Sequence, residues 1–405
     1  MKRLFTFILT LTMAFSFCVN SLAAATTTTT ATETTATTTA TTEASADTSN
    51  TQATSTSYKT SKLSGAPDIV AESAVVMDAG TGTVLYGKEA STKRYPASIT
   101  KVMTALLAVE NCNMSDVITY SNAAVNGIEA GSSTAGINVG AKLTVEDSLY
   151  ALMLVSANEA AAAIAEHISG STTEFAKLMT KHAKELGCKN TQFKNPHGLP
   201  DEEHYTTAYD MGLILKEAMK HPEFRKIAGT ISYTLKKSDS LTDTLELWNH
   251  AKILRQNSDY YYEYAEGAKT GFTQVALNTL VTYAKKDNVE LICVILKDHG
   301  ADKSYTDTAN LFKWAFNQVK AVTPLTDFSL KTAMTENSSI DSAKLDQIQL
   351  LNSSYDTNFS VLVKKDFDES TLKTAFKLDE DKKTGRLGYI IISCDGKELG
   401  RTEVT

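Results

Sequence analysis

Lys101 lies in an apolar stretch three residues after Ser98, within the segment YPASITKVMTALLAVE (95–110). Residues spaced by three share one face of a helix, so the two side chains can meet. Burial favours neutral lysine, and a neutral amine beside a hydroxyl can take its proton. At a helix start, backbone N–H groups also favour a developing oxyanion. The pair predicts nucleophilic catalysis by Ser98 with Lys101 as base, although a bare S-x-x-K more often marks a surface lysine.

The same motifs occur a second time, and only their surroundings separate the copies. Residues 370–373 (STLK) repeat S-x-x-K, and residues 383–385 repeat the K-T-G triplet of 269–271. The second copies lie in or near a charged stretch, LDEDKKTGRLG, which is typical of a solvated turn. The first copies have the one S-x-N sequence of the chain, residues 156–158 (SAN), between them. This ordered set is typical of penicillin-binding proteins and class A β-lactamases.

Turn signals and apolar spacing predict the elements that position these motifs. Segments 72–78 and 83–88, joined by a glycine-bearing turn, predict a β-hairpin. Helices are expected after Pro96, after Thr144 as N-cap, and over 160–168 and 173–187, with helical patterns continuing to about Ala228. Strands over 267–273, 277–284 and 289–296 and a helix over 310–319 follow. Strands on both sides of a helical middle predict an α+β domain with one sheet, spanning 58–322.

The two ends of the chain differ from this domain. Residues 1–25 predict a secretory signal peptide, with Lys2 and Arg3 before an apolar run, although an uncleaved anchor helix is an alternative. Residues 26–57 are almost entirely Thr, Ala and Ser, which predicts a disordered spacer. Residues 323–405 predict a small all-β domain with a hairpin turn at Asp395-Gly396. The protein is therefore expected to be exported, and its contact with a membrane is left open.

Composition excludes several classes of function. The net charge of −7 and the absence of a basic cluster argue against a nucleic-acid partner. No C-x-x-C pair occurs among the cysteines, which are expected to be free thiols. His197, Asp201 and His204 could form a zinc site, but their Pro and Gly neighbours indicate a turn, and no metal or cofactor is expected. The tyrosines of 260–264 could line a groove or pack under a loop.

Residues 65–320 resemble the low-molecular-mass penicillin-binding proteins, specifically the serine D-alanyl-D-alanine carboxypeptidases. Besides the three motifs, PASITKVMTAL (96–106), NPHGLPDEEHYTTAYDM (195–211) and EGAKTGFT (266–273) carry the resemblance. It implies a β-lactamase/DD-peptidase-like fold, with an antiparallel sheet flanked by helices, a helical subdomain and a small C-terminal β domain. It also implies an extracytoplasmic enzyme that acts on peptidoglycan stem peptides ending in D-Ala-D-Ala and is acylated by β-lactams.

The resemblance also implies roles for the residues of the first two motifs. Ser98 would attack the carbonyl between the terminal D-alanines, and Lys101 would activate Ser98. Ser156 would relay a proton to the leaving D-alanine. Asn158 would hold Lys101 and the amide of the substrate.

The third motif would bind and polarise the substrate. The resemblance implies that Lys269 and Thr270 bind the terminal carboxylate, and that Lys269 helps to keep Lys101 neutral. Gly271 would let the backbone of the substrate approach, and the N–H groups of Ser98 and Phe272 would form the oxyanion hole.

Two other functions share this machinery. A class A β-lactamase would need a deacylating glutamate within E-x-x-L-N, which the chain lacks, and Ala157 replaces the aspartate of S-D-N. A non-catalytic wall-binding protein of the same fold is the other alternative. The intact Ser98, Lys101 and Lys269 argue against it.

Overall fold

The computed structural model describes residues 63–237, 241, 243–335, 340 and 353–405. The predicted signal peptide and spacer lie outside these residues and stay predictions. Within the described ranges, every helix is too short or too polar to cross a membrane.

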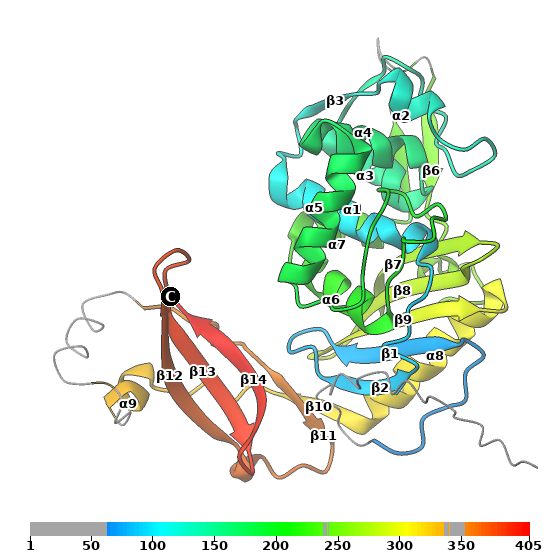
Figure 1. Ribbon diagram of the computed structural model, residues 1–405. Coiled ribbons are helices and arrows are strands. Elements are labelled where there is room, and N and C mark those ends of the chain that lie inside the picture. The colour runs from blue at the N-terminus through cyan, green and yellow to red at the C-terminus, as the bar shows by residue number, and fades with distance from the viewer. Residues whose placement is uncertain (1–62, 238–240, 242, 336–339, 341–352) are drawn as a thin grey trace, which may run out of the picture. The chain divides into compact units, whose positions relative to one another are not determined.

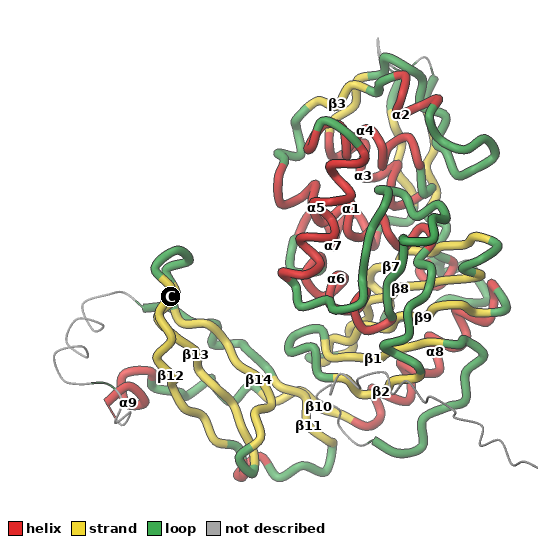
Figure 2. The backbone as a smooth tube through the Cα atoms, viewed as in Figure 1, coloured by secondary structure: helices red, strands yellow, loops and turns green. Residues whose placement is uncertain are grey.

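A five-stranded antiparallel sheet forms the base of the fold, as predicted (Figures 1 and 2). Its order is β2-β1-β9-β8-β7, so strands from the start and the end of the segment lie side by side. The strands are β1 (Ser73–Asp78), β2 (Val84–Lys88), β7 (Ala265–Thr273), β8 (Leu277–Lys286) and β9 (Val289–Asp298). β7, which carries the first K-T-G copy, is an edge strand: among the strands that the structure describes, it pairs with β8 alone.

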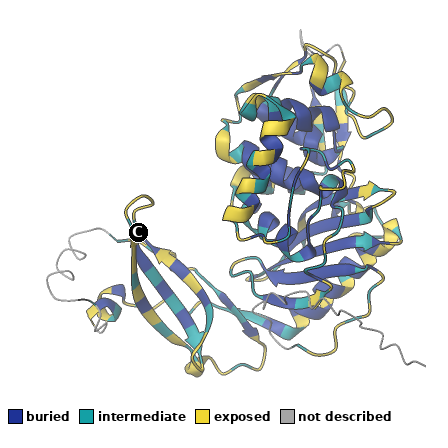
Figure 3. Cartoon of the chain, in the orientation of Figure 1, coloured by how far each residue is buried: buried dark blue, intermediate teal, exposed yellow. Residues whose placement is uncertain are grey.

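The strands of the large sheet are mostly buried (Figure 3), and alternation along them divides the buried residues into two cores. In β1, Val75 and Met77 belong to one core, whereas Ala74 and Val76 belong to the other. Because successive side chains point to opposite faces, each face of the sheet needs its own cover. α6 (Ala208–Ala218) and α7 (Pro222–Gly229) contact one set of strands, and α8 (Ala301–Gln318) covers the opposite face (Figure 1).

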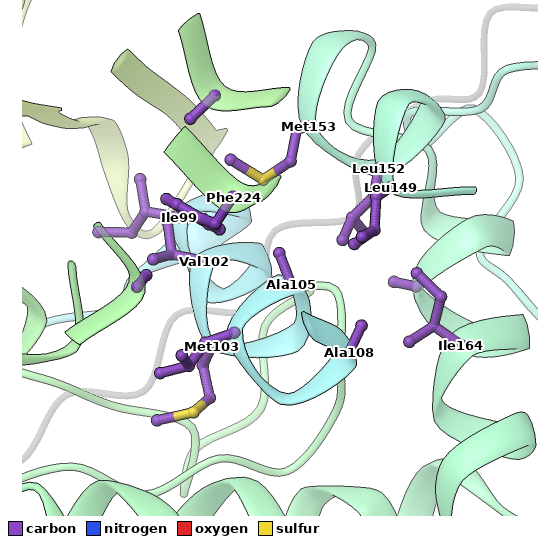
Figure 4. Packing of buried hydrophobic residues seen from close by; sticks show 14 of the residues in the cluster. Ile99, Val102, Met103, Ala105, Ala108, Leu149, Leu152, Met153, Ile164 and Phe224 are labelled. Carbon is purple, nitrogen blue, oxygen red and sulfur yellow. The ribbon is translucent and has the colours of Figure 1, made fainter. Parts of the chain in front are cut away.

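The helical subdomain is built around the helix that follows Ser98. α1 lies among the other helices, and Figure 4 shows Val102, Met103 and Ala105 packed with Leu149 and Ile164. The subdomain contains α1 (Lys101–Asn111), α2 (Asn122–Asn126), α3 (Val145–Leu154), α4 (Asn158–Ser169) and α5 (Thr172–Glu185). Two short hairpins accompany it: β3 (Val117–Thr119) with β4 (Lys142–Thr144), and β5 (Ser232–Leu235) with β6 (Leu245–Trp248).

The helix predictions are confirmed in most places and wrong in two. The side chain of Thr144 accepts a hydrogen bond from Asp147 N and caps α3, as expected. The helical region is interrupted over 186–207, where Pro196 and Gly198 (φ +92°) do not fit a helix. α8 begins nine residues before the predicted start at 310, because its polar first half lacks a clear apolar stripe.

The C-terminal region forms the expected β structure with a core of its own. Its elements are β10 (Val319–Val322), α9 (Leu330–Thr335), β11 (Val361–Lys364), β12 (Lys373–Asp381), β13 (Arg386–Cys394) and β14 (Lys397–Val404). β13 and β14 are joined at Asp395-Gly396, both of which have positive φ, as a tight hairpin turn requires. β10 ends at the proposed domain boundary and pairs with β11 beyond it, and the division at 322/323 stays a prediction.

Candidate active site

Ser98 lies in a single 3₁₀ turn, Ala97–Thr100, that leads directly into α1. Ala97 has φ +52°, a left-handed conformation that is uncommon for a residue with a side chain. Such strain persists only where the surroundings hold it, and it often marks a functional site. Ser98 is half-buried while Ala97 and Ile99 are fully buried, so the turn presents the serine hydroxyl at the surface of the core.

Lys101 is completely buried, and its side-chain nitrogen has three close oxygen neighbours. Nζ lies 2.7 Å from Asn158 Oδ1, 2.8 Å from His197 O and 3.1 Å from Ser98 Oγ. Burial lowers the pKa of Lys101 well below its usual value of 10.5, and the charge of Lys269 lowers this pKa further, while Glu159 raises it. A neutral amine has two N–H donors and one lone pair, so donation to Asn158 and His197 leaves the lone pair for Ser98.

The S-x-N motif lies at the junction of α3 and α4. Ser156 has φ +63°, and its buried Oγ has no hydrogen-bond partner among the described residues. α4 begins at Asn158, two residues before the predicted start at 160, so the side chain of Asn158 projects from the helix start to Lys101. Asn158 N also donates to Ser133 O at 2.9 Å, which ties this junction to the segment before β4.

The first K-T-G copy lies on β7 beside the 3₁₀ turn. Lys269 is buried, Nζ donates to Thr270 O at 2.9 Å, and burial lowers the pKa of Lys269 to about 7. A Cβ on Gly271 would lie 2.8 Å from Ser98 N and would collide with Thr279 Oγ1. Only glycine therefore lets β7 approach the turn this closely, a reason for Gly271 that the sequence interpretation did not contain.

A cavity of about 360 Å³ brings the three motifs together. Lys101 and Lys269 are buried and do not line it. Its lining residues are Ser98, Gly131, Ser132, Ser133, Ser156, Asn158, Gly198, Leu199, His250, Thr270, Gly271, Phe272, Thr273 and Asn278. All eight predicted site residues therefore line the cavity or lie directly against it. Sequence reasoning missed the segment 131–133, His250 and Asn278, because no motif spacing connects them to Ser98.

The second copies of the motifs do not form such an arrangement. Ser370 lies in an exposed turn, and residues 383–385 form the solvated turn between β12 and β13 that their charged neighbours predicted. None of them lines the cavity. The sequence context therefore separated the copies that meet at the cavity from those that do not.

The other residues that the sequence analysis considered as site candidates take part in local packing and hydrogen bonds. Nδ1 of His204 accepts from Lys194 N, and Nε2 is 2.9 Å from Thr100 Oγ1, so both ring nitrogens are engaged within the protein. Tyr262 is buried and stacks on Phe312, which favours packing for the tyrosine segment. The four cysteines of the described ranges are free, as expected. One group of possible metal ligands is found in these ranges, Glu110, Glu217 and His221, and it does not line the cavity.

Comparisons with known sequences agree with this geometry. A peptidase S11 family model, described as D-alanyl-D-alanine carboxypeptidase, matches residues 59–300. D-alanyl-D-alanine carboxypeptidase DacF of Bacillus subtilis is 34% identical over 346 residues, which are 82% of this chain and 84% of that relative. DacA of Haemophilus influenzae, with the same enzyme name, is 30% identical over 62% of this chain and 63% of its own length.

Solved structures agree on the fold. The crystal structure of a D-alanyl-D-alanine carboxypeptidase from Mycobacterium tuberculosis matches 62% of this chain and 93% of its own, with a TM-score of 0.57 and 27% identity. Penicillin-binding protein 6B from Escherichia coli matches 86% of this chain and 98% of its own, with a TM-score of 0.64. At 23% identity the latter match concerns the fold alone, and it confirms the predicted fold class.

Proposed function

The chain belongs to the peptidase S11 family and is a serine-type D-alanyl-D-alanine carboxypeptidase, and from this premise we propose that Ser98 and Lys101 perform its chemistry. The observation that carries the proposal is the surroundings of Lys101 Nζ. Two acceptors, Asn158 Oδ1 and His197 O, take the N–H groups of a neutral amine, and Ser98 Oγ lies where the lone pair remains. Lys101 is the general base that this arrangement supports.

The substrate would be a peptidoglycan stem peptide that ends in D-Ala-D-Ala, bound along the free edge of β7. An extended peptide can add to an edge strand through main-chain hydrogen bonds. Thr270 lines the cavity and the neighbouring Lys269 is buried, and together they would hold the terminal carboxylate, Thr270 through its hydroxyl and Lys269 through its charge. Lys269 is charged below its pKa of about 7, and a bound carboxylate would stabilise that charge further.

The reaction proceeds through an ester on Ser98. As Ser98 Oγ bonds to the carbonyl carbon of the penultimate D-alanine, its proton passes to Lys101 Nζ. The oxyanion accepts hydrogen bonds from the N–H groups of Ser98 and Phe272, each contributing about 3 kcal/mol to the transition state. The C–N bond then breaks, and the proton taken up by Lys101 passes through Ser156 to the nitrogen of the released D-alanine, which leaves Lys101 neutral again. Water, deprotonated by Lys101, finally hydrolyses the ester and frees Ser98.

Two further points belong to this proposal. The protein works outside the cytoplasmic membrane, at the cell wall, because its substrate is there. β-Lactams acylate Ser98, because their strained amide presents a carbonyl at the same place as the D-Ala-D-Ala bond. The exported state rests on the family and on the predicted signal peptide.

The first test is D-alanine release from a short peptide ending in D-Ala-D-Ala, comparing the unmodified protein with Ser98→Ala. We expect release to be lost in Ser98→Ala, together with covalent labelling by a fluorescent penicillin. EDTA should leave the release unchanged, since no step uses a metal. Release that persists in Ser98→Ala would show that another group is the nucleophile. Rapid hydrolysis of penicillin without release of D-alanine would favour the β-lactamase alternative.

A further inference from the structure

Glu159 is a completely buried carboxylate that no step of the proposed mechanism uses. It is the second residue of α4 and directly follows Asn158, which contacts Lys101. Burying a carboxylate costs free energy unless hydrogen bonds satisfy it, so a buried glutamate at this junction needs a structural explanation.

One oxygen of Glu159 holds a single segment of the chain. Oε1 accepts hydrogen bonds from Thr134 Oγ1 at 2.7 Å, Ala135 N at 2.7 Å, Gly136 N at 3.1 Å and Ile137 N at 3.4 Å. Successive backbone N–H groups that converge in this way form a binding site for a negative charge. A carboxylate oxygen fits it better than the oxygen of a neutral amide, because hydrogen bonds to an ionised acceptor are stronger.

The segment that Glu159 holds continues into a wall of the cavity. Residues 131–133, immediately before Thr134, line the cavity next to Ser98. Ser133 O accepts a hydrogen bond from Asn158 N at 2.9 Å. The wall and the residues that follow it are therefore attached to the first turn of α4 at two neighbouring residues, Asn158 and Glu159. A shift of Glu159 would therefore move the wall.

The charge of Glu159 also acts on Lys101. Three titratable groups face Lys101: Lys269 from β7, His197 from the loop before α6, and Glu159 from α4. Burial lowers the pKa of His197 to about 3, so His197 is neutral near pH 7. Lys269 lowers the pKa of Lys101 and Glu159 raises it, so the two charges oppose each other. On the far side, Glu159 faces Tyr120, whose pKa is raised mainly by burial.

We propose that Glu159 is a positioning residue of the carboxypeptidase: its carboxylate holds residues 134–137 and thereby fixes residues 131–133 as a wall of the cavity. The proposal rests on the proposed function, because its effect is measured on the release of D-alanine. The structure assigns this role to the charge and to the length of the side chain, and two substitutions separate these properties.

Glu159→Asp keeps the charge but withdraws the carboxylate by one methylene from residues 134–137. We expect kcat/KM for a short D-Ala-D-Ala peptide to fall by about 10²-fold, since a displacement of about 1 Å near a reacting group has that effect. The acidic limb of the pH profile of kcat/KM should stay in place, because the negative charge near Lys101 remains.

Glu159→Gln keeps the length but removes the charge. We expect kcat/KM to fall as well, because the amide oxygen holds the four donors more weakly. Loss of the negative charge lowers the pKa of Lys101, so the acidic limb should move to lower pH. A residue with a purely structural role would not produce this difference between the pH profiles of the two variants.

Glu166→Gln is the matched control, because it makes the same chemical change on the same helix without lining the cavity. Its kcat/KM and pH profile should equal those of the unmodified protein. Thr134→Val removes one donor from the wall and leaves the charge, and it should raise KM with little change in kcat. If Glu159→Gln shows no cooperative unfolding transition, and is therefore not properly folded, Thr134→Val becomes the deciding variant in its place.

An unchanged kcat/KM in Glu159→Asp and Glu159→Gln would overturn the proposal, as would an unchanged KM in Thr134→Val. A fall in activity that Glu166→Gln reproduces would overturn it too, because the effect would then be general to α4. The unmodified protein is assayed alongside. If it releases no D-alanine, the proposed function has failed, whereas normal release with unaffected variants contradicts only the role of Glu159.

Discussion

At the scale of single residues, the proposed mechanism requires different protonation states of the two buried lysines, Lys101 and Lys269. Both lose proton affinity through burial, but Lys101 also has the charge of Lys269 close by. Burial and the charge of Lys269 therefore both favour the neutral form of Lys101, which is the form that the proposed base for Ser98 requires. Lys269 stays protonated up to about pH 7, so below that pH its charge can pair with a carboxylate. The activity should rise with pH as Lys101 deprotonates and decline as Lys269 does.

Lys269→Met tests this division. Without the charge of Lys269, the pKa of Lys101 should rise, so the acidic limb of kcat/KM should move to higher pH. Loss of a charge-assisted hydrogen bond to the terminal carboxylate should raise KM by about tenfold to a hundredfold. The pH profile of D-alanine release measures both effects.

Lys383→Met is the control for this substitution, because Lys383 has the same neighbours in sequence but lies in an exposed turn. Its profile should match that of the unmodified protein. An acidic limb that stays in place in Lys269→Met would mean that Lys269 does not act on Lys101.

At the scale of elements, the site depends on the close packing of β7 against the 3₁₀ turn of Ser98. Thr279 Oγ1 of β8 donates to Pro96 O at 2.8 Å, and Gly271 has no side chain to hold the turn away. The two N–H groups proposed for the oxyanion hole, of Ser98 and Phe272, come from these two elements. Their separation is set by the packing of the elements and not by either element alone.

Gly271→Ala should force the turn and β7 apart, because a Cβ there meets Ser98 N at 2.8 Å and Ala97 Cβ at 3.1 Å. We expect kcat/KM to fall by about 10²-fold through misplacement of the oxyanion hole. Overpacking should also lower the free energy of unfolding by about 1–3 kcal/mol. Steady-state kinetics and urea unfolding measure the two effects.

Gly385→Ala, in the second K-T-G copy, provides the contrast. Gly385 has φ +77° with open space around it, so the substitution should lower the free energy of unfolding by about 1–2 kcal/mol and leave the kinetics unchanged. Full activity in Gly271→Ala would mean that β7 can retreat without disturbing Ser98.

At the scale of the whole molecule, the hydrophobic cores suggest how the chain is divided. The two cores of the large sheet share no buried residue with the third core, which lies within residues 325–404. A region with its own core can in principle fold alone. Val319 of β10 belongs to a core of the large sheet, although the strand pairs with β11.

A chain that ends at Val322 should therefore still release D-alanine from a short peptide, within a few-fold of the full chain. Its melting temperature should be lower, because Leu362 of β11 packs against the core that contains Val319. Scanning calorimetry and the release assay test this. Complete loss of activity in a folded truncated chain would show that residues 323–405 take part in the site.

Local chemistry made much of this protein predictable from its sequence. Ser98 and Lys101 are close in sequence, and the turn between β1 and β2 and the cap at Thr144 are local patterns. The order of the three motifs also identified the fold class, and charged neighbours excluded the second copies. Apart from the order of the motifs, each of these signals involves residues within a few positions of one another, where backbone geometry alone sets the distances.

The tertiary structure decided the rest, because it depends on distances between segments far apart in sequence. His197 O reaches Lys101 across 96 residues, and the approach of Gly271 to Ser98 N joins two elements that no periodicity connects. The wall at 131–133 and its attachment to Glu159 carry no motif at all. The sequence by itself determined the fold class and the candidate catalytic groups, and the packing of distant elements decided how the charges and oxygens of these groups meet.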